Sequence, residues 1–160
     1  MNHVSSCVTP LGRLYLEASA DGLTQISLAS GIVEERPNDI ITEARKQLQA
    51  YFKGEIKQFD LPLDFSNATV FQQKVWTELT HIPYGKTISY LELALKVGTE
   101  KHTRAVGLAN GKNPIPIIVP CHRVIGSDGT LTGYALGLPM KRYLLNLENS
   151  GSFAVQASLF

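Results

Sequence analysis

The sequence is poor in the features that mark membrane, disulfide-rich and metal-binding proteins. Its 160 residues include only two cysteines, Cys7 and Cys121, which fits a reducing compartment better than a disulfide scaffold. The two cysteines lack the close spacing of a metal-ligand pair, and the four histidines are scattered. Met1 is followed by polar residues and no long apolar run occurs. We therefore expect a cytoplasmic protein with no signal peptide, membrane span or metal site.

Charge is nearly balanced over the whole chain but not along it. The formal net charge is +1 at pH 7, which by itself says nothing about nucleic acid. Residues 1–70 hold six Lys/Arg against nine Asp/Glu, a balance of −3, whereas residues 71–160 hold nine against five, a balance of +4. This asymmetry indicates that a polyanionic partner would meet the second part of the chain.

The first part of the chain has the pattern of a small α/β domain. Alternating apolar residues predict short strands between residues 3 and 28, and helical spacing predicts a helix over residues 40–53. Alternation resumes from Phe59 to Phe65, which predicts an edge strand because it contains a proline. No chemical motif occurs here, so we expect a supporting domain over residues 1–67 that ends in a linker at residues 66–68.

Helices dominate the second part. Thr69–Gln72 and Ser89–Glu92 are capping boxes that each begin a helix, and Thr99–Gly111 predicts a third helix. Two helices joined by a tight glycine-containing turn are the helix-turn-helix pattern, although an ordinary helical hairpin has the same pattern. We expect this helical domain over residues 68–150, followed by a loosely held tail over residues 151–160.

The third predicted helix is unusually rich in small residues from Arg104 to Gly111. Proteins that read the major groove usually place long polar side chains on base edges. Small residues instead allow a helix backbone to approach a narrow minor groove while an arginine reaches into the base stack. Close packing between helices also uses alanine and glycine, and is the alternative.

The stretch from Asn113 to Val124 carries the chemistry. Its apolar run, flanked by prolines, predicts a stiff, buried, extended segment. Cys121 and His122 then stand side by side, and a thiol beside an imidazole can become a thiolate nucleophile. A buried structural cysteine at the end of a strand is the alternative.

The string from Pro120 to Val124, with Asn113 and Pro114 upstream, closely resembles the active-site signature of the O6-alkylguanine-DNA alkyltransferases, the methylated-DNA–protein-cysteine methyltransferases. The resemblance covers most of the chain in outline and is strong from residue 71 to residue 148. It implies an α/β first domain of ribonuclease-H-like form. It also implies a mainly helical, winged-helix-like second domain that binds DNA and carries the reactive cysteine.

The resemblance implies a role for each matched residue. Cys121 would accept the alkyl group, His122 would activate it, and Glu148 would orient His122. Asn113 would hold the turn before the reactive segment, and Tyr90 would donate a hydrogen bond to the flipped base. Neighbouring side chains on extended backbone point apart, so a link from Cys121 to His122 requires a turn or a bridging water.

Two further sets of residues follow from the same resemblance. Arg104 would fill the gap that a flipped base leaves in the stack. The implied DNA-binding residues are Tyr90, Arg104, Ala105, Gly107 and Arg123. The implied substrate-pocket residues are Pro116, Val124, Tyr134, Ala135 and Leu136.

The implied function is repair of double-stranded DNA. The protein would flip out O6-methylguanine, and also O4-methylthymine, and transfer the alkyl group irreversibly to Cys121. We expect the protein to act once, because nothing in the chain could cleave the thioether product. We also expect a monomer that needs no cofactor. A module that senses alkylated bases without chemistry is the alternative. A Cys-His hydrolase is less favoured, because the chain lacks a recognisable oxyanion donor motif.

One position departs from the family pattern. Relatives usually follow the tyrosine of this loop with Gly or Ser and then more glycines, whereas this chain has Ala135 and Leu136. If the Leu136 side chain faces the substrate pocket, the side chain narrows the pocket. The protein would then accept bulky alkyl groups poorly. Alternatively, Leu136 faces solvent or packs within the loop.

Overall fold

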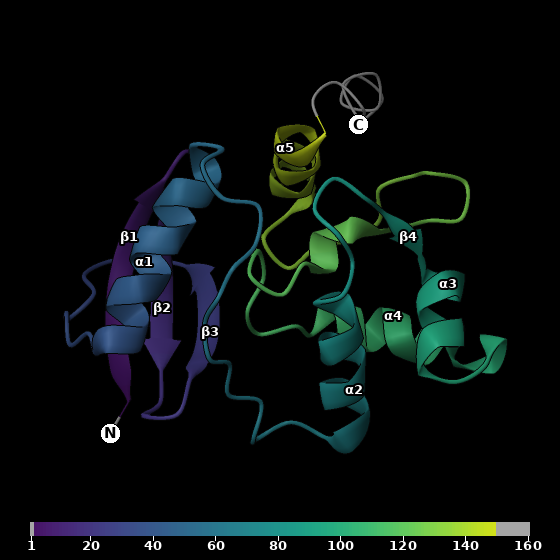
Figure 1. Ribbon diagram of the computed structural model, residues 1–160, viewed down its shortest axis with the longest axis horizontal. Helices are drawn as coiled ribbons and strands as arrows, with labels where there is room; N and C mark the ends of the chain where they lie inside the picture. Colours follow the sequence, from purple (N-terminus) through teal and green to yellow (C-terminus); the bar gives the residue numbers. More distant parts are fainter. Residues whose placement is uncertain (1, 150–160) are drawn as a thin grey trace. The chain divides into compact units, whose positions relative to one another are not determined.

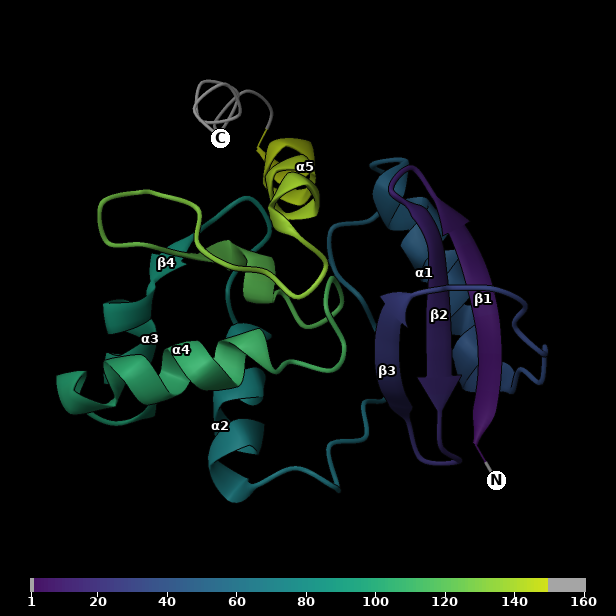
Figure 2. The same cartoon turned by 180° about the vertical axis from the view of Figure 1, so that it is seen from behind.

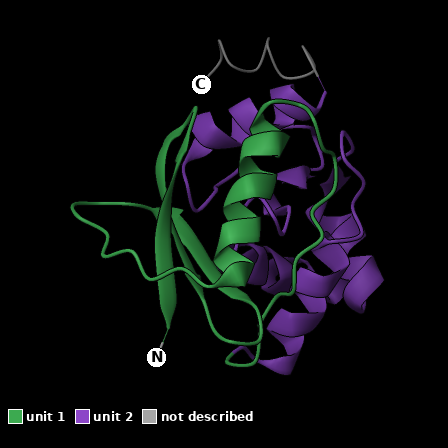
Figure 3. Cartoon of the chain, turned by 60° about the vertical axis from the view of Figure 1, so that its left-hand side comes forward, with its two compact units in different colours: residues 1–67 green, residues 68–160 purple. Residues whose placement is uncertain are grey.

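The computed structural model describes residues 2–149, and the chain divides into two compact units, residues 1–67 and 68–160 (Figure 3). The division falls inside the segment that the sequence marks as a linker. The predicted tail at residues 151–160 lies outside the described residues. Across the described part of the chain, no helix has both the length and the apolar character needed to cross a bilayer.

Unit 1 is a three-stranded antiparallel sheet with one helix against it, as Figures 1 and 2 show. Its elements are β1 (His3–Thr9), β2 (Gly12–Ala18), β3 (Leu23–Leu28) and α1 (Asp39–Phe52). Leu14 and Leu16 are fully buried at alternate positions of β2, which is the period that the sequence predicts. The strands and the helix predicted for this part of the chain are confirmed.

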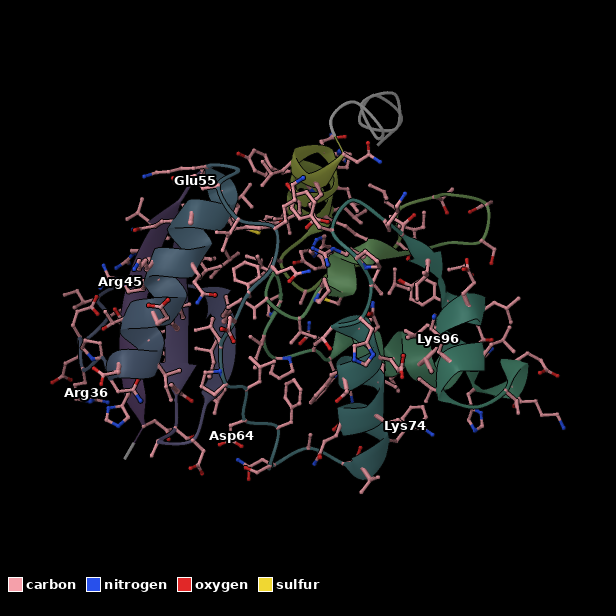
Figure 4. All side chains as sticks on the ribbon, viewed as in Figure 1. Arg36, Arg45, Glu55, Asp64, Lys74 and Lys96 are labelled. Carbon is pink, nitrogen blue, oxygen red and sulfur yellow. The ribbon has the colours of Figure 1, made fainter. Side chains whose placement is uncertain are left out.

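The edge strand predicted from Phe59 to Phe65 is wrong. Only an isolated parallel bridge joins Leu63 to Leu23. The N–H of Leu23 donates to the Pro62 carbonyl and the N–H of Asp64 donates to the Leu23 carbonyl, each at 2.9 Å. Pro62 has no N–H, so the ladder cannot continue through it. The segment therefore lies beside the start of β3 as irregular chain, with Asp64 (Figure 4) accepting a hydrogen bond from the Ser19 hydroxyl.

Unit 2 is mainly helical. Its elements are α2 (Val70–Leu79), β4 (Ile88–Ser89), α3 (Tyr90–Val97), the 3₁₀ turn η1 (Glu100–His102), α4 (Thr103–Gly111), the 3₁₀ turn η2 (Cys121–Arg123), β5 (Val124–Ile125) and α5 (Leu138–Glu148). Both capping boxes, at Thr69 and Ser89, are confirmed with their reciprocal hydrogen bonds. Thr99 caps η1, and α4 follows directly after it. The family layout of an α/β unit followed by a helical unit is therefore present.

Long-range contacts set the arrangement of these helices. The indole Nε1 of Trp76 donates to the carbonyl of Ala109 at 2.8 Å, which joins α2 to α4 (Figure 2). Strands β4 and β5 pair in parallel, with Ser89 opposite Ile125. This pairing brings the start of α3 beside the chain that leaves η2. After β5 the chain makes a turn, in which the Gly126 N–H donates to the Thr130 carbonyl at 2.9 Å, and it returns from this turn as a loop.

Candidate active site

The segment before Cys121 is buried but not extended. Residues 113–120 form successive turns organised by Asn113, whose Oδ1 accepts from the Ile115 N–H at 3.0 Å while Nδ2 donates to the Val119 carbonyl at 2.8 Å. Ile117, 1% exposed, has φ 77°, a left-handed conformation that β-branched residues rarely adopt. The predicted extended segment is therefore wrong. Its prolines cannot donate to a strand ladder, and the chain folds onto the Asn113 side chain instead.

Cys121 begins the turn η2 and is 2% exposed. Burial raises the pKa of its thiol to about 11, while the Asn113 amide and the Lys141 ammonium act in the opposite direction. Because only the thiolate is a strong nucleophile, the resting thiol needs a base before it can react near neutral pH. The turn also changes the directions of the Cys121 and His122 side chains from those on extended backbone.

His122 and Glu148 form a buried hydrogen-bonded pair. Nε2 of His122 lies 2.7 Å from Oε2 of Glu148, and their side chains are 0% and 1% exposed. Burial lowers the pKa of His122, although Glu148 opposes this. Burial alone would raise the pKa of Glu148, but hydrogen bonds from His122 and Arg123 outweigh it and hold the pKa below its ordinary range.

These directions assign the protons of the pair. An ionised carboxylate only accepts hydrogen bonds, so Nε2 of His122 must carry the hydrogen. Nδ1 then holds the lone pair. Nδ1 is buried and makes no hydrogen bond within residues 2–149. His122 is thus a neutral imidazole with a free basic nitrogen, oriented by Glu148.

Arg123 does not reach the surface. It is 6% exposed, and its Nε and Nη2 donate to the two Glu148 oxygens at 2.8 and 2.9 Å. Its Nη1 donates to the Ile82 carbonyl at 2.6 Å. The prediction that Arg123 contacts DNA is therefore not supported. The donors of the buried guanidinium are instead satisfied by the Glu148 carboxylate and the Ile82 carbonyl.

A pocket of about 590 Å³ opens between the start of α3, one face of α4 and the loop after β5. It is lined by Tyr90, Thr103, Gly107, Gly111, Thr132, Gly133, Tyr134 and Ala135. Three of these residues recur every four positions on α4, which places them on one face of that helix. The ring of Tyr134 meets the ring of His122 edge-on, with centroids 6.5 Å apart. This contact connects the pocket to the Cys121 turn.

The predicted pocket residues divide into two groups. Tyr134 and Ala135 line the pocket. Pro116 and Val124 are buried and Leu136 is half-buried, and none of the three is among the lining residues. The structure therefore favours the alternative in which the Leu136 side chain packs away from the pocket.

The surface of α4 has the character expected of a DNA-contacting helix. Arg104 and Ala105 are exposed, and Gly107 is half-buried beside the ring of Tyr90. Further exposed lysines lie on the neighbouring helices, with Lys74 on α2 and Lys96 on α3 (Figure 4). Unit 2 thus presents positive charge on several of its helices, as the charge distribution along the sequence predicts.

Sequence reasoning missed Lys141. Its side chain is fully buried, and its Nζ donates to the carbonyls of Val124 at 2.8 Å and Thr132 at 3.0 Å. Burial lowers its pKa to about 8, while the Cys121 thiolate acts to raise it. The signal was present, because the helical spacing of Lys141, Leu144 and Glu148 places Lys141 on the buried face of α5.

Asn110 was also missed. It is 4% exposed on α4, and its Nδ2 donates to the Cys121 carbonyl at 3.4 Å. Its Oδ1 is buried and makes no hydrogen bond within residues 2–149. The amide joins the end of α4 to the reactive turn. In that same part of the chain, no group of three or more His, Cys, Asp or Glu residues could hold a metal ion.

Comparison with known proteins follows the same division of the chain. Residues 3–65 match the family "6-O-methylguanine DNA methyltransferase, ribonuclease-like domain" and residues 70–150 match "6-O-methylguanine DNA methyltransferase, DNA binding domain". A methylated-DNA–protein-cysteine methyltransferase of Methanosarcina acetivorans is 48% identical over 149 residues, which are 89% of this chain and 95% of the relative. The constitutive enzyme of that name from Bacillus subtilis is 44% identical over 159 residues, 92% of this chain and 96% of the relative.

Solved structures agree. The Mycobacterium tuberculosis O6-methylguanine methyltransferase is 44% identical, covers 100% of both chains and has a TM-score of 0.83. A crystal structure of the Mycobacterium tuberculosis protein in complex with DNA is 47% identical, covers 92% of this chain and 93% of that one, and also has a TM-score of 0.83. The chain therefore belongs to the 6-O-methylguanine DNA methyltransferase family.

Proposed function

We propose that this protein repairs DNA by moving the alkyl group of O6-alkylguanine onto the sulfur of its own Cys121. One observation carries the proposal. The buried Cys121 thiol is followed by an imidazole whose Nδ1 lone pair is free because a buried carboxylate holds its other nitrogen. The names of the relatives, and the DNA complex of the Mycobacterium tuberculosis protein, support DNA as the partner.

The pocket suits a base taken out of the duplex. The alkyl group on guanine O6 cannot reach a buried thiol while the base remains stacked, so the base must be flipped out. The small-residue face of α4 borders the pocket, and Arg104 is exposed on the same helix. We assign Arg104 to the gap in the stack, and Ala105 and Gly107 to close contact with the minor groove.

The chemical step is a displacement at an sp³ carbon. His122 Nδ1, which makes no direct hydrogen bond to the Cys121 thiol, takes the thiol proton through a bridging water, and the thiolate attacks the alkyl carbon. A C–S bond forms and the C–O6 bond breaks, so its electron pair stays on the departing guanine. Tyr90, in the pocket wall, donates a hydrogen bond to that guanine as its charge develops.

Asn113 and the Lys141 ammonium favour the thiolate form of Cys121. Arg123 and Glu148 act further from the reacting atoms, because they hold His122 in its tautomer. A thioether is stable to the imidazole, amide and ammonium groups described around Cys121. Each molecule therefore reacts once.

Mass spectrometry after incubation with a duplex that contains O6-methylguanine tests the proposal. We expect one methyl group on the peptide that contains Cys121 and none on Cys7, whose pKa burial also raises. Cys121→Ser should bind the duplex and gain nothing. Binding without a mass change in the wild type would favour a sensing module instead, and turnover of a substrate at unchanged mass would favour a hydrolase.

All residues of the proposed site lie between Ile82 and Glu148 of one chain, which supports a monomer. Light scattering with and without DNA tests this.

We also propose that the pocket accepts O4-methylthymine, which the same mass measurement tests with the corresponding duplex. The two free cysteines support a reducing compartment such as the cytoplasm.

A further inference from the structure

A hydrogen bond joins the start of α3 to the loop after β5. The hydroxyl of Tyr90 lies 2.6 Å from the hydroxyl of Thr132, and either atom could be the donor. Both residues line the pocket. The matched family motifs assign no role to Thr132, and its side chain is exposed, so the core does not require it.

The backbone of Thr132 is held in place from two sides. Its carbonyl accepts a hydrogen bond from the buried Lys141 ammonium at 3.0 Å. The preceding residue, Leu131, is 4% exposed and belongs to a buried cluster with Leu145 on α5. The backbone that carries the threonine hydroxyl is therefore already fixed. Its hydrogen bond costs less conformational entropy than a contact between two mobile surface residues.

Tyr90 is equally well placed. It is the first residue of α3, directly after Ser89, which caps that helix and pairs with Ile125 in the β4–β5 ladder. Lys141 holds the backbone of Thr132, and the pairing of β4 with β5 holds the start of the helix that carries Tyr90. The 2.6 Å contact between the two hydroxyls therefore belongs to the proposed site.

We propose that Thr132 is a positioning residue that sets the direction of the Tyr90 phenol hydrogen. This inference rests on the proposed function, in which Tyr90 donates to the departing guanine. The phenol has one hydrogen, and it cannot serve Thr132 and the base together. When a base occupies the pocket, the threonine hydroxyl must therefore donate and the phenol oxygen must accept.

That direction has a chemical consequence. Donation from Thr132 stabilises negative charge on the phenol oxygen, so Tyr90 becomes a stronger donor as the C–O6 bond breaks. The electron pair of that bond goes to the guanine, and the Tyr90 hydrogen moves toward it. Thr132 itself touches neither the sulfur nor the alkyl carbon in this scheme.

The test is single-turnover methyl transfer from duplex DNA by Thr132→Val, which keeps the shape of the side chain and removes the hydroxyl. Thr132→Ser restores the hydroxyl, and both variants are also made in a Tyr90→Phe background. One neutral hydrogen bond corresponds to about a threefold to tenfold change in rate. We expect Thr132→Val to lower the maximal rate by that factor without changing the DNA concentration for half-maximal rate.

Two further results are expected. Thr132→Ser should recover most of the rate. In the Tyr90→Phe background, Thr132→Val should change the rate by less than about twofold, because the phenol through which Thr132 acts is already absent. An equal loss in both backgrounds, or no rescue by serine, would overturn the proposal and indicate that Thr132 acts through the loop. If Tyr90→Phe slows transfer but Thr132→Val does not, only the Thr132 inference fails. If wild-type Cys121 gains no methyl group, the proposed function itself fails.

Discussion

Glu148→Gln is the substitution that tests the buried network most directly. Glutamine keeps the shape of the side chain but removes its negative charge. The Glu148 carboxylate accepts from His122 at 2.7 Å and from Arg123 at 2.8 and 2.9 Å, and its side chain is 1% exposed. Glutamine offers one acceptor oxygen and one NH₂ group in that place, so one of these donors must face another donor.

The magnitude follows from the burial. Removing one partner of a buried ion pair leaves the other charge without compensation, which costs about 3–5 kcal/mol. Here the group left behind is the Arg123 guanidinium, at 6% exposure. The stability of a typical domain is about 5–15 kcal/mol, so we expect a large fall in the unfolding midpoint of the variant. Loss of the correct His122 tautomer also removes the base, which lowers the transfer rate by about 100-fold or more.

A second substitution separates the two effects. In the double variant Arg123→Met/Glu148→Gln the uncompensated charge is gone, and most of the lost stability should return. The transfer rate should stay low, because His122 still lacks its carboxylate. Glu55→Gln, which removes an exposed carboxylate from unit 1, is the matched control and should change neither quantity (Figure 4).

The assay is urea unfolding of each variant, together with single-turnover methyl transfer measured below its unfolding transition. Recovery of both stability and transfer rate in the double variant would refute the orienting role of Glu148, since it would show that the carboxylate serves only to neutralise Arg123. A wild-type rate in the single variant would show that His122 does not need the Glu148 carboxylate to act as the base.

Three other predictions concern the DNA, the pocket and the buried lysine. Arg104→Ala should slow repair of duplex DNA strongly but affect free O6-methylguanine much less, because unstacking costs a few kcal/mol that only the duplex requires; equal losses in the two rate assays contradict its role. Leu136→Gly should leave inactivation by O6-benzylguanine unchanged, since Leu136 does not line the pocket; faster inactivation of the variant would show that this residue restricts it. Lys141 has its pKa lowered from 10.5 to about 8, so the unfolded chain binds more protons between those values. The difference in free energy of unfolding, wild type minus Lys141→Met, should therefore rise with pH across this window in urea titrations. A flat or falling difference excludes the lowered pKa of Lys141.

The sequence by itself determined the local structure and the family. The capping boxes at Thr69 and Ser89 need only contacts between residues three apart, so they can be predicted without knowledge of the fold. The apolar periods of the first part likewise predicted short strands between residues 3 and 28 and one helix after them. The Cys121 motif identified the chemistry because a rare combination of neighbouring residues carries it.

Only the tertiary structure decided which groups the site uses. Arg123 has the character of a surface residue in the sequence, but the ion pair with Glu148, 25 positions away, draws it inside. Lys141 and Asn110 lie on helix faces that pack against the reactive turn, and that packing alone determines that their polar atoms meet backbone carbonyls. The prediction of an edge strand was wrong because pairing at Leu63 depends on the position of β3, and because Pro62 has no N–H with which to extend the ladder. Contacts between distant segments depend on the path of the whole chain, so no local pattern encodes them.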